Sequence, residues 1–462
     1  MKNIWLFTRI KLVLPVAFLI LVSGCQKFLD QKMNKRDIIP QKLDDLQALL
    51  DNNESMNAKD PALLELLSDN YFISRENWEP YASTSEGQHY IWAGNALPNS
   101  VSWDFVYQFP VYISNVTLDQ LEQVKIGQEE QQKYNAIKGG CLFHRAFGLW
   151  EIAQLFCRPF SIENASAPGI VLRTTANPNI RSTRVTVKET YDQIVNDLRT
   201  AVLLLPATSS FPTRPTKTAA RAMLARVFLS MRDYDNAWKY ADTALQEQSG
   251  LMDYNTLVPL KSPRIATFNK EVIFHSYCAP VGFLADYMAR VDSTLYNSYN
   301  ENDLRKIVFF RENASPNAGT YAFQGSYHGN GSASHVFTGL TTGELYLVIS
   351  ECLARKGIIN EAMQYLNGLL VMRWNKDFPF QALIAADTVE ALGLILSERR
   401  KELLFRGLRW SDIRRMNLEG ANITLKRILG DSTYLLPPND ARSVMLIPWN
   451  EITRSEIEQN VR

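Results

Sequence analysis

The stretch SERRKELLFRGLRWSDIRRMN, residues 397–417, decides the fold because charged and large apolar residues share neighbouring sides of a helix. Glu398, Arg399 and Glu402 fall at helical spacing, and an apolar stripe that begins at Leu392 runs beside them. Buried charges have to be paired, so this mixture predicts a partly buried corner of ion pairs. A solvated helix face is the alternative that a charge run alone favours.

A turn and a second helix are expected directly after the charged helix. Gly407 follows the last apolar turn, at a place where a left-handed residue ends many helices. Arg409, Trp410, Asp412 and Arg415 then begin the second, short helix. The stretch as a whole is therefore interpreted as helix, turn and short helix.

The composition is that of an ordinary globular protein with one large domain or two to three smaller ones. The chain has 462 residues, of which 46% are hydrophobic and 21% are charged. Its net charge of +1 argues against a nucleic-acid partner, which would favour a basic face. Aromatic residues make up 11% of the chain, and this content matters because flat rings offer stacking faces to a ligand.

The N-terminus has the pattern of a bacterial lipoprotein signal. A positive segment precedes the apolar run Leu12–Val22, which is too short to span a bilayer. The run ends in Val-Ser-Gly before Cys25, which resembles a lipobox. A diacylglycerol on Cys25 would anchor the protein, since each buried CH₂ contributes roughly 0.8 kcal/mol. We expect a signal peptide over 1–24, a lipidated leader over 25–41 and one domain over 42–462; an ordinary signal peptide with a chance cysteine is the alternative.

Apolar periodicity predicts a mainly helical protein. Helices are expected over residues 42–50, 62–71, 103–124 with an interruption near Pro110, 133–156, 187–205, 216–231, 235–247, 344–356, 360–372 and 388–405. The second of these would begin at Asp60-Pro61, with Asp60 as its N-cap. Residues 227–245 align without gaps to residues 352–370, and this pattern resembles tetratricopeptide repeats. The sequence therefore predicts an all-α fold of helix pairs that are separated by long insertions; two amphipathic hairpins that are similar by chance are the alternative.

Two loop-rich regions, residues 75–99 and 262–343, combine glycines with many aromatic side chains. Long structured insertions on a helical frame often carry function, and aromatic faces can lie against a sugar ring. The candidate ligand-binding residues are therefore Trp78, Tyr81, Trp92, Tyr296 and Tyr327. For each ring, packing that pins the loop is the alternative.

No catalytic motif is found in the sequence. The chain lacks HExxH, GxSxG and GxxxxGKS/T, and the glycine-rich segment Gly325–Gly331 has no Lys-Ser/Thr pair for a phosphate. His328 and His335 have no evident third metal ligand, so no metal and no cofactor are expected. The two carboxylates of a glycosidase need no fixed spacing, so motifs alone do not exclude a hydrolase.

The cysteines of the mature chain are expected to be small buried hydrophobic residues. Cys141 and Cys157 lie on one predicted helix, where an unbroken helix would separate them by about 24 Å. That separation is too large for a disulfide bond.

Several of these segments together resemble the SusD/RagB family of outer-membrane nutrient-binding lipoproteins. The segment KGGCLFHRAFGLWEIAQLF is similar to the family's G-E-A-x-F-x-R-A-x-x-Y-F-x-L, and the tail LIPWNEI to its I-P-x-x-E-I. Arg406 and Gly140 depart from the family pattern, which has an acid at both positions. Residues 397–417 are similar to the C-terminal motif E-R-x-x-E-L-x-x-E-G-x-R-W-x-D-L-x-R, with these residues in register: Glu398, Arg399, Glu402, Gly407, Arg409, Trp410, Asp412 and Arg415.

The resemblance implies a lipid-anchored protein on the outer face of the outer membrane. Such a protein would bind a glycan or another nutrient and deliver it to a SusC-like TonB-dependent transporter, without bond chemistry. A surface-anchored glycoside hydrolase and a repeat scaffold that binds only protein are the alternatives. Product release would identify the first, and a co-purifying partner without any small ligand would identify the second. The sequence does not specify whether the nutrient is starch, another glycan or a peptide.

Overall fold

The computed structural model describes residues 42–462. The predicted signal peptide, the leader and Cys25 lie outside the described residues. Within the described part, α-helices dominate and every sheet has only two short strands. The predicted all-α fold is therefore confirmed.

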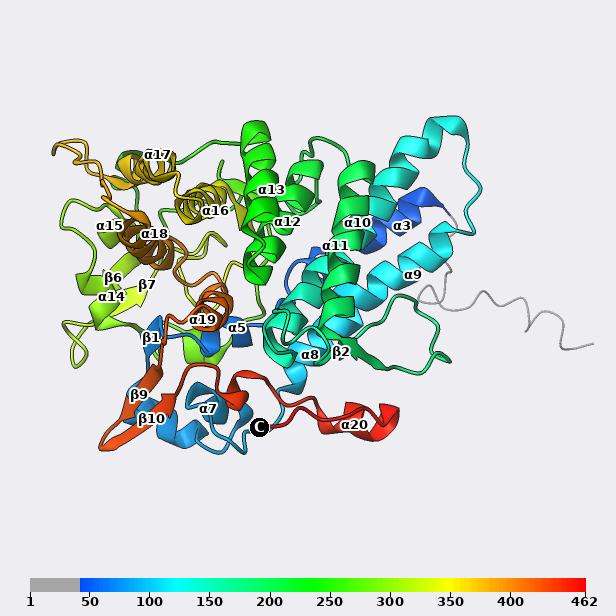
Figure 1. The fold of residues 1–462 in the computed structure, drawn as a ribbon, viewed down its shortest axis with the longest axis horizontal. Helices are drawn as coiled ribbons and strands as arrows, with labels where there is room; N and C mark the ends of the chain where they lie inside the picture. Colours follow the sequence, from blue (N-terminus) through cyan, green and yellow to red (C-terminus); the bar gives the residue numbers. More distant parts are fainter. Residues whose placement is uncertain (1–41) are drawn as a thin grey trace, which may run out of the picture. The chain divides into compact units, whose positions relative to one another are not determined.

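The long helices carry the architecture (Figure 1). They are α3 Leu43–Leu50, α9 Tyr112–Leu121, α10 Gln131–Phe156, α11 Val187–Leu204, α12 Lys217–Met231, α13 Tyr234–Glu247, α16 Thr342–Arg355, α17 Ile359–Leu370, α18 Thr388–Glu402 and α19 Arg409–Leu418. Helix α10 packs against α11, α11 against α12, α12 against α13, and α13 against α16. Helix α16 in turn contacts both α17 and α18, so neighbouring helices form one continuous scaffold.

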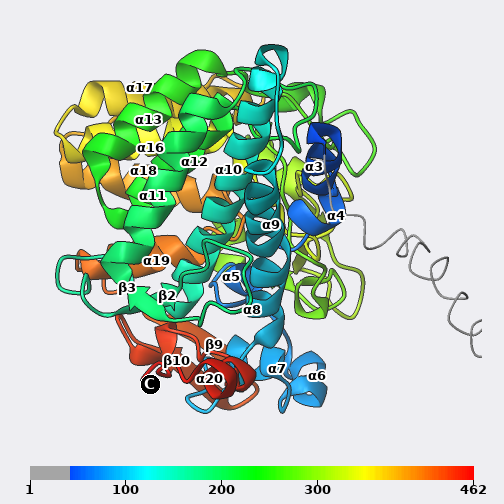
Figure 2. The ribbon, with the colours of Figure 1, turned by 90° about the vertical axis from the view of Figure 1, so that its right-hand side faces the viewer.

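Short elements fill the rest of the chain. The short helices and turns are α4 Asn53–Met56, α5 Leu63–Leu66, α6 Arg75–Trp78, η1 Glu79–Tyr81, α7 Ser85–Tyr90, α8 Ser100–Val106, η2 Tyr107–Val111, η3 Gln128–Glu130, η4 Tyr254–Thr256, η5 Gly282–Leu284, α14 Ser293–Asn297, α15 Arg305–Phe309, η6 Val371–Arg373, η7 Ala441–Ser443 and α20 Trp449–Ser455. The strand pairs are β1 Tyr71–Phe72 with β5 Arg290–Val291, β2 Pro168–Val171 with β3 Arg184–Thr186, β4 Val272–Phe274 with β8 Leu340–Thr341, β6 Phe310–Glu312 with β7 Tyr321–Phe323, and β9 Leu425–Leu429 with β10 Ser432–Leu436. Figure 2 shows β9, β10 and α20 gathered at one end, away from the α13–α16–α17 helix pairs.

Side-chain caps explain where several long helices begin. The Thr186 hydroxyl accepts a hydrogen bond from the Glu189 N–H, and the Glu189 carboxylate accepts one from the Thr186 N–H, which is a capping box for α11. Thr216 caps α12 and Thr341 caps α16 in the simpler way, by accepting from the N–H three residues on. These caps fix the predicted helix starts to within a few residues.

The two aligned segments form equivalent helix pairs, α12–α13 and α16–α17. The aligned residues Tyr234 and Ile359 each begin the second helix of a pair. Their aligned alanines, Ala237 and Ala362, are completely buried. Because an alanine lets two helix backbones approach closely, the predicted repeat-like packing is confirmed.

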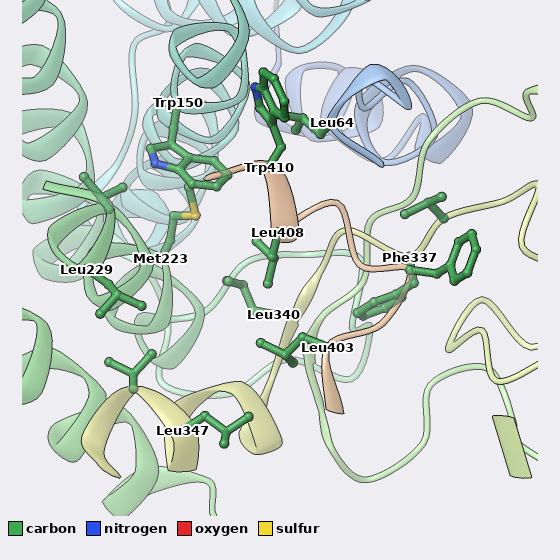
Figure 3. Close-up of a cluster of buried hydrophobic side chains, with 14 of the residues drawn as sticks. Leu64, Trp150, Met223, Leu229, Phe337, Leu340, Leu347, Leu403, Leu408 and Trp410 are labelled. Atoms are coloured by element: carbon green, nitrogen blue, oxygen red, sulfur yellow. The ribbon is translucent and has the colours of Figure 1, made fainter. Parts of the chain in front are cut away.

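One hydrophobic core joins the helix pairs to the C-terminal corner. Trp150 of α10 and Trp410 of α19 are both fully buried in it, and the Trp150 N–H donates to the Ser230 hydroxyl at 3.1 Å. Figure 3 shows how residues from distant segments meet in this core: Leu64, Trp150, Met223, Leu229, Phe337, Leu340, Leu347, Leu403, Leu408 and Trp410.

The charged stretch forms a buried ion-pair corner, as the sequence predicts. Here "ion-pair corner" means Glu398, Arg399, Glu402, Arg409, Asp412 and Arg415 together with their partners. Arg399 Nε lies 2.9 Å from Asp412 Oδ2, and Arg415 Nη1 lies 2.6 Å from Glu351 Oε1. Arg409 Nε lies 2.7 Å from Asp69 Oδ1. The alternative, a solvated helix face, is wrong because these pairs are largely shielded from water.

Gly407 and Arg406 explain the turn inside the corner. Gly407 has φ +68°, so the predicted left-handed position is confirmed. The Arg406 guanidinium carbon lies 3.5 Å from the Tyr327 ring centroid and 4.8 Å from that of Phe337. A cation–π contact thus occupies the place at which the family motif has an acid.

Other segments differ from the sequence prediction. The helix expected over 62–71 is only the short α5, and Asp60 is not its cap. Asp60 is buried and accepts hydrogen bonds from the hydroxyls of Ser276, at 2.5 Å, and Thr338. Residues 75–90 form α6, η1 and α7 in place of a loop, because Ser74 and Thr84 cap the short helices. The predicted interruption near Pro110 is present as the short π-helix η2, which contains Pro110.

Two further features concern export and membranes. Cys141, Cys157, Cys278 and Cys352 are free and buried, so the prediction that they are small buried residues is confirmed. Among residues 42–462, none of the helices has the length and apolar character needed to cross a bilayer.

Candidate functional site

The two loop-rich regions of the sequence meet in the structure. Strand β1 pairs with β5, so that Tyr71 lies opposite Val291. The Asn77 side-chain amide donates to the Tyr287 carbonyl at 3.2 Å. Tyr81 and Phe283 make an edge-to-face contact with ring centroids 5.5 Å apart. We call the exposed face formed by residues 75–81 and 281–291 the junction surface.

The junction surface presents two tyrosines to solvent. Tyr81 is 44% exposed, and Tyr287 is 70% exposed. Tyr81 was predicted, whereas Tyr287 was missed because nothing in its sequence context separates it from the buried tyrosines of the same insertion. Solvent-exposed rings on a fixed backbone offer apolar area to a sugar face and leave their hydroxyls free for hydrogen bonds.

Trp78 lies at the edge of the same surface. Its indole N–H donates to the Gly87 carbonyl at 2.9 Å, and its ring lies 6.3 Å from that of Tyr434 in β10. The ring is half-buried. Trp78 therefore fixes the loop, and its remaining exposed edge adds apolar area beside Tyr81.

Trp92 and Tyr327 have packing roles, and the structure leaves neither with an open ring face. Trp92 is 2% exposed and its indole N–H donates to the Leu67 carbonyl at 3.2 Å. Tyr327 is 1% exposed and its hydroxyl donates to Glu271 Oε2 at 2.5 Å. Burial raises the pKa of Tyr327 well above its ordinary value. A ligand cannot stack on either ring in this structure, so we remove both from the candidate site.

Tyr296 stands apart on the short helix α14, beside the β6–β7 hairpin. It is stacked on Tyr321 of β7, with ring centroids 3.6 Å apart and planes 14° from parallel. The Lys306 ammonium lies 5.2 Å from its centroid. Burial and the hydrogen bond with Tyr321 raise the pKa of Tyr296. Because Tyr321 already covers one face of this ring, Tyr296 is a secondary candidate.

Charged side chains flank the exposed tyrosines. Arg75 pairs with Glu79 at 3.4 Å on the short helices that carry Trp78 and Tyr81. Asp286, next to Tyr287, pairs with Arg311 at 3.1 Å. Both pairs are balanced in charge, so the junction surface suits a neutral ligand with many hydroxyls better than an ion.

The histidine pair does not form a metal centre. The rings of His328 and His335 are stacked, with centroids 5.1 Å apart. Among residues 42–462, no group of three histidine, cysteine or acidic side chains is placed to hold a metal ion.

One cleft holds two carboxyl groups, and the charge of one acts on the other. It has a volume of about 400 Å³ and is lined by Asp104, Tyr107 and Tyr112 on one side and by Glu451 and Arg454 on the other. Burial raises the pKa of Asp104. Burial and the charge of Asp104 raise the pKa of Glu451. This cleft is the place to test the hydrolase alternative.

These observations define the class of the protein as a helical scaffold with an aromatic surface loop. Comparisons with known proteins agree with this description. Residues 27–229 match a SusD-like family described as "Starch-binding associating with outer membrane". The chain is 23% identical over 353 residues to SusD-like protein P2 of Formosa agariphila, an alignment that covers 63% of this chain and 67% of that protein.

Solved structures show the same fold. A SusD superfamily protein of Bacteroides thetaiotaomicron has a TM-score of 0.74 and 21% identity, with 91% of this chain and 100% of that chain covered. A surface glycan-binding protein of Bacteroides fluxus has a TM-score of 0.68 and 17% identity, with 91% and 99% covered. The predicted resemblance to the SusD/RagB family is therefore confirmed.

Proposed function

We propose that the protein captures a glycan at the junction surface and delivers it to a SusC-like TonB-dependent transporter. The observation that carries this proposal is the pair of exposed rings, Tyr81 and Tyr287, which two separate insertions bring together on a rigid helical frame. The description of the matching family and the name of the Bacteroides fluxus structure support a carbohydrate ligand. In this proposal Cys25 bears the lipid that holds the protein on the outer face of the outer membrane.

Binding is tested by titrating the purified mature chain with malto-oligosaccharides, other plant and host glycans, and peptides in a calorimeter. We expect a glycan to bind without being cleaved. Tyr287→Ala should weaken that binding about tenfold, which corresponds to about 1.4 kcal/mol, and Tyr81→Ala should act in the same direction. Phe378→Ala is the matched control, since Phe378 is an exposed aromatic residue, 49% accessible, outside the junction surface. Equal weakening in the control would contradict the proposed site.

Delivery and anchoring need separate tests. Cys25→Ser should release the protein from the membrane fraction, because multiple acyl chains supply the stable anchorage. A tagged, anchored protein should co-purify with a TonB-dependent outer-membrane protein. Co-purification with such a partner, combined with no binding to any glycan or peptide, would instead support the protein-only scaffold.

The second candidate function is glycoside hydrolysis in the Asp104–Glu451 cleft. The raised pKa of both carboxyls is what a general acid requires. Chromatography of oligosaccharides incubated with the protein distinguishes the two functions. Products that disappear in Asp104→Asn and in Glu451→Gln would replace the binding proposal with a hydrolase, whereas intact substrate supports capture.

A further inference from the structure

A second cavity lies at a different place in the fold, between α3, α10 and residues 205–215. Its volume is about 230 Å³. Its floor is formed by Ala136, Gly140 and His144, which are four residues apart and therefore share one face of α10. Gln47 of α3 lines it from the other side.

The missing side chain at Gly140 keeps this cavity open. The family motif has an acid at this position, and this chain has glycine. A Cβ placed on Gly140 would already lie 3.3 Å from Leu50 Cδ1. A longer side chain would therefore occupy the space above the floor, and the cavity depends on the residue that distinguishes this chain from the motif.

His144 is a largely buried polar side chain that lines the cavity. It is 3% exposed, and within residues 42–462 its ring makes no hydrogen bond. Its ring lies against those of Phe143 and Phe274, with ring centroids 5.8 and 5.6 Å apart. Burial lowers the pKa of His144 to about 4, so the ring is neutral near pH 7 and offers one N–H donor and one nitrogen acceptor. The ring nitrogens of His144 are not among the fully enclosed polar atoms that lack a partner, so a hydroxyl group in the cavity can reach them.

The mouth of the cavity combines a ring with hydroxyl groups. Phe211 is 56% exposed, and the Arg214 guanidinium carbon lies 5.0 Å from its centroid. Both carboxylate oxygens of Asp51 accept from Arg214, at 2.7 and 2.6 Å, so the charge of Arg214 is already matched. The hydroxyl side chains on the same wall are those of Thr208, Ser209 and Ser210.

We propose that this cavity binds one neutral sugar ring, with His144 hydrogen-bonded to a ring hydroxyl and Phe211 covering an apolar face. The size favours a single ring, since pockets for drug-sized ligands begin at about 300 Å³. The matched charges select against anionic sugars. This site shares no residue with the junction surface, so it is a second binding site on the chain.

Histidine NMR tests the proposal directly, because the chain has only five histidines. The mature protein is labelled with ¹³C at the histidine ε1 carbon, and His144→Gln assigns the His144 signal. Glucose, galactose and mannose are then titrated, with glucuronate and inorganic phosphate as charged comparators. We expect one of the neutral sugars to shift the His144 signal in a saturable way, while the signals of the other histidines stay in place.

Two variants decide whether the shift comes from the cavity. Gly140→Glu should abolish it by filling the space. Gly393→Glu is the matched control on α18, where no atom lies within 4 Å of an added Cβ, and it should leave the shift unchanged. If circular dichroism shows that Gly140→Glu does not fold, Phe211→Ala replaces it. This variant should weaken sugar binding at least fivefold.

The outcome is separable from that of the proposed function. The Tyr81→Ala, Tyr287→Ala double variant should keep the His144 shift, because it leaves the second cavity intact. Absence of a saturable shift with all three neutral sugars would overturn the proposal. So would a shift that persists in Gly140→Glu, or one caused only by glucuronate or phosphate.

Discussion

At the scale of single residues, the family motif and this chain differ most instructively at Arg406. An acid is replaced by a buried cation, which would be unfavourable without a partner. The rings of Tyr327 and Phe337 supply that partner through their negative faces. The sequence alone reveals the departure, but the partner is visible only in the structure, because Tyr327 is 79 positions away in the chain.

Removing this cation should lower stability. Arg406→Met keeps most of the volume but loses the cation–π contact, and we expect a loss of about 2 kcal/mol in the free energy of unfolding. Urea denaturation followed by tryptophan fluorescence measures it. Arg406→Lys should lose less, since it keeps the charge. A methionine variant as stable as the parent protein would show that the contact contributes nothing.

Asp60 should make stability depend on pH. Burial raises its pKa to about 7, although the hydroxyls of Ser276 and Thr338 act in the opposite direction. Its pKa when unfolded is near the ordinary value of 3.8, so the folded state holds the proton more tightly. The contribution is therefore fully present below pH 4 and is lost as the pH rises through 7.

Asp60→Asn tests this sign. The amide imitates the protonated acid, so the variant should gain stability relative to the parent as the pH rises from 4 to 8. The relative gain is of order 3–5 kcal/mol, from about 1.4 kcal/mol per pKa unit. Urea midpoints at several pH values measure it. A difference between the two proteins that is constant with pH would exclude the raised pKa.

At the scale of elements, the helix pairs were predictable and the C-terminal hairpin was not. Apolar periodicity and N-caps fix the long helices locally, so a single sequence contains the necessary signal. Strand β9 also alternates, with Leu425, Arg427 and Leu429 facing inward. The middle position of this buried face is an arginine, which conceals the pattern. Arg427 is accommodated by the rings of Tyr90 and Trp92, at 4.4 and 4.9 Å, and such contacts cannot be read from the strand itself.

The candidate site was predictable only in part, for the same reason. Glycine and aromatic content marked residues 75–99 and 262–343 as candidate binding regions, and the structure shows that parts of the two regions are in contact. Which rings stay exposed depends on long-range packing, and the sequence pattern treats Tyr81 and Trp92 alike. The indole N–H of buried Trp92 donates to the Leu67 carbonyl, and that of half-buried Trp78 donates to the Gly87 carbonyl. Neither contact can be read from the local sequence.

The aligned alanines give a prediction about helix crossings. Ala237→Leu and Ala362→Leu should each destabilise the protein by about 1–3 kcal/mol, because the larger side chain separates two packed helices. Similar losses at both positions would show that the crossings are equivalent. Thermal unfolding by calorimetry measures them, with Gln246→Leu on the exposed face of α13 as the control. A leucine tolerated at either alanine would mean that this crossing is loosely packed.

At the scale of the whole molecule, one charge network joins three distant segments. Glu402 of α18 lies 2.8 Å from Arg373, which follows the second helix pair, and 3.2 Å from Arg305 of the main insertion. Arg373 also lies 3.0 Å from Glu271, next to β4. The segment that carries the family motif thus ties the insertion to the repeat scaffold. A buried network of this kind holds the insertion in one position, which is what a binding surface built on it requires.

Breaking the network at Glu402 should therefore affect stability and binding together. Burial alone would raise its pKa, but the charges of Arg373 and Arg305 dominate and lower it. A lowered pKa stabilises the protein above the unfolded value of 4.5, and this contribution is lost as the pH falls through the folded pKa. At pH 7, Glu402→Gln removes a carboxylate partner of the buried Arg373 and Arg305. The free energy of unfolding should therefore fall by about 3–5 kcal/mol. The deficit relative to the parent should shrink below pH 4.5.

Glu361→Gln, on the exposed face of α17, is the control and should unfold like the parent protein. Urea unfolding across pH 3–8 measures stability, and calorimetry with the bound glycan measures the junction surface. Because the network positions the insertion that carries Tyr287, glycan affinity should fall in Glu402→Gln even at temperatures where the variant is folded. A variant that loses stability but keeps full affinity would show that the junction surface is held by β1, β5 and the Asn77 contact alone, without help from the network.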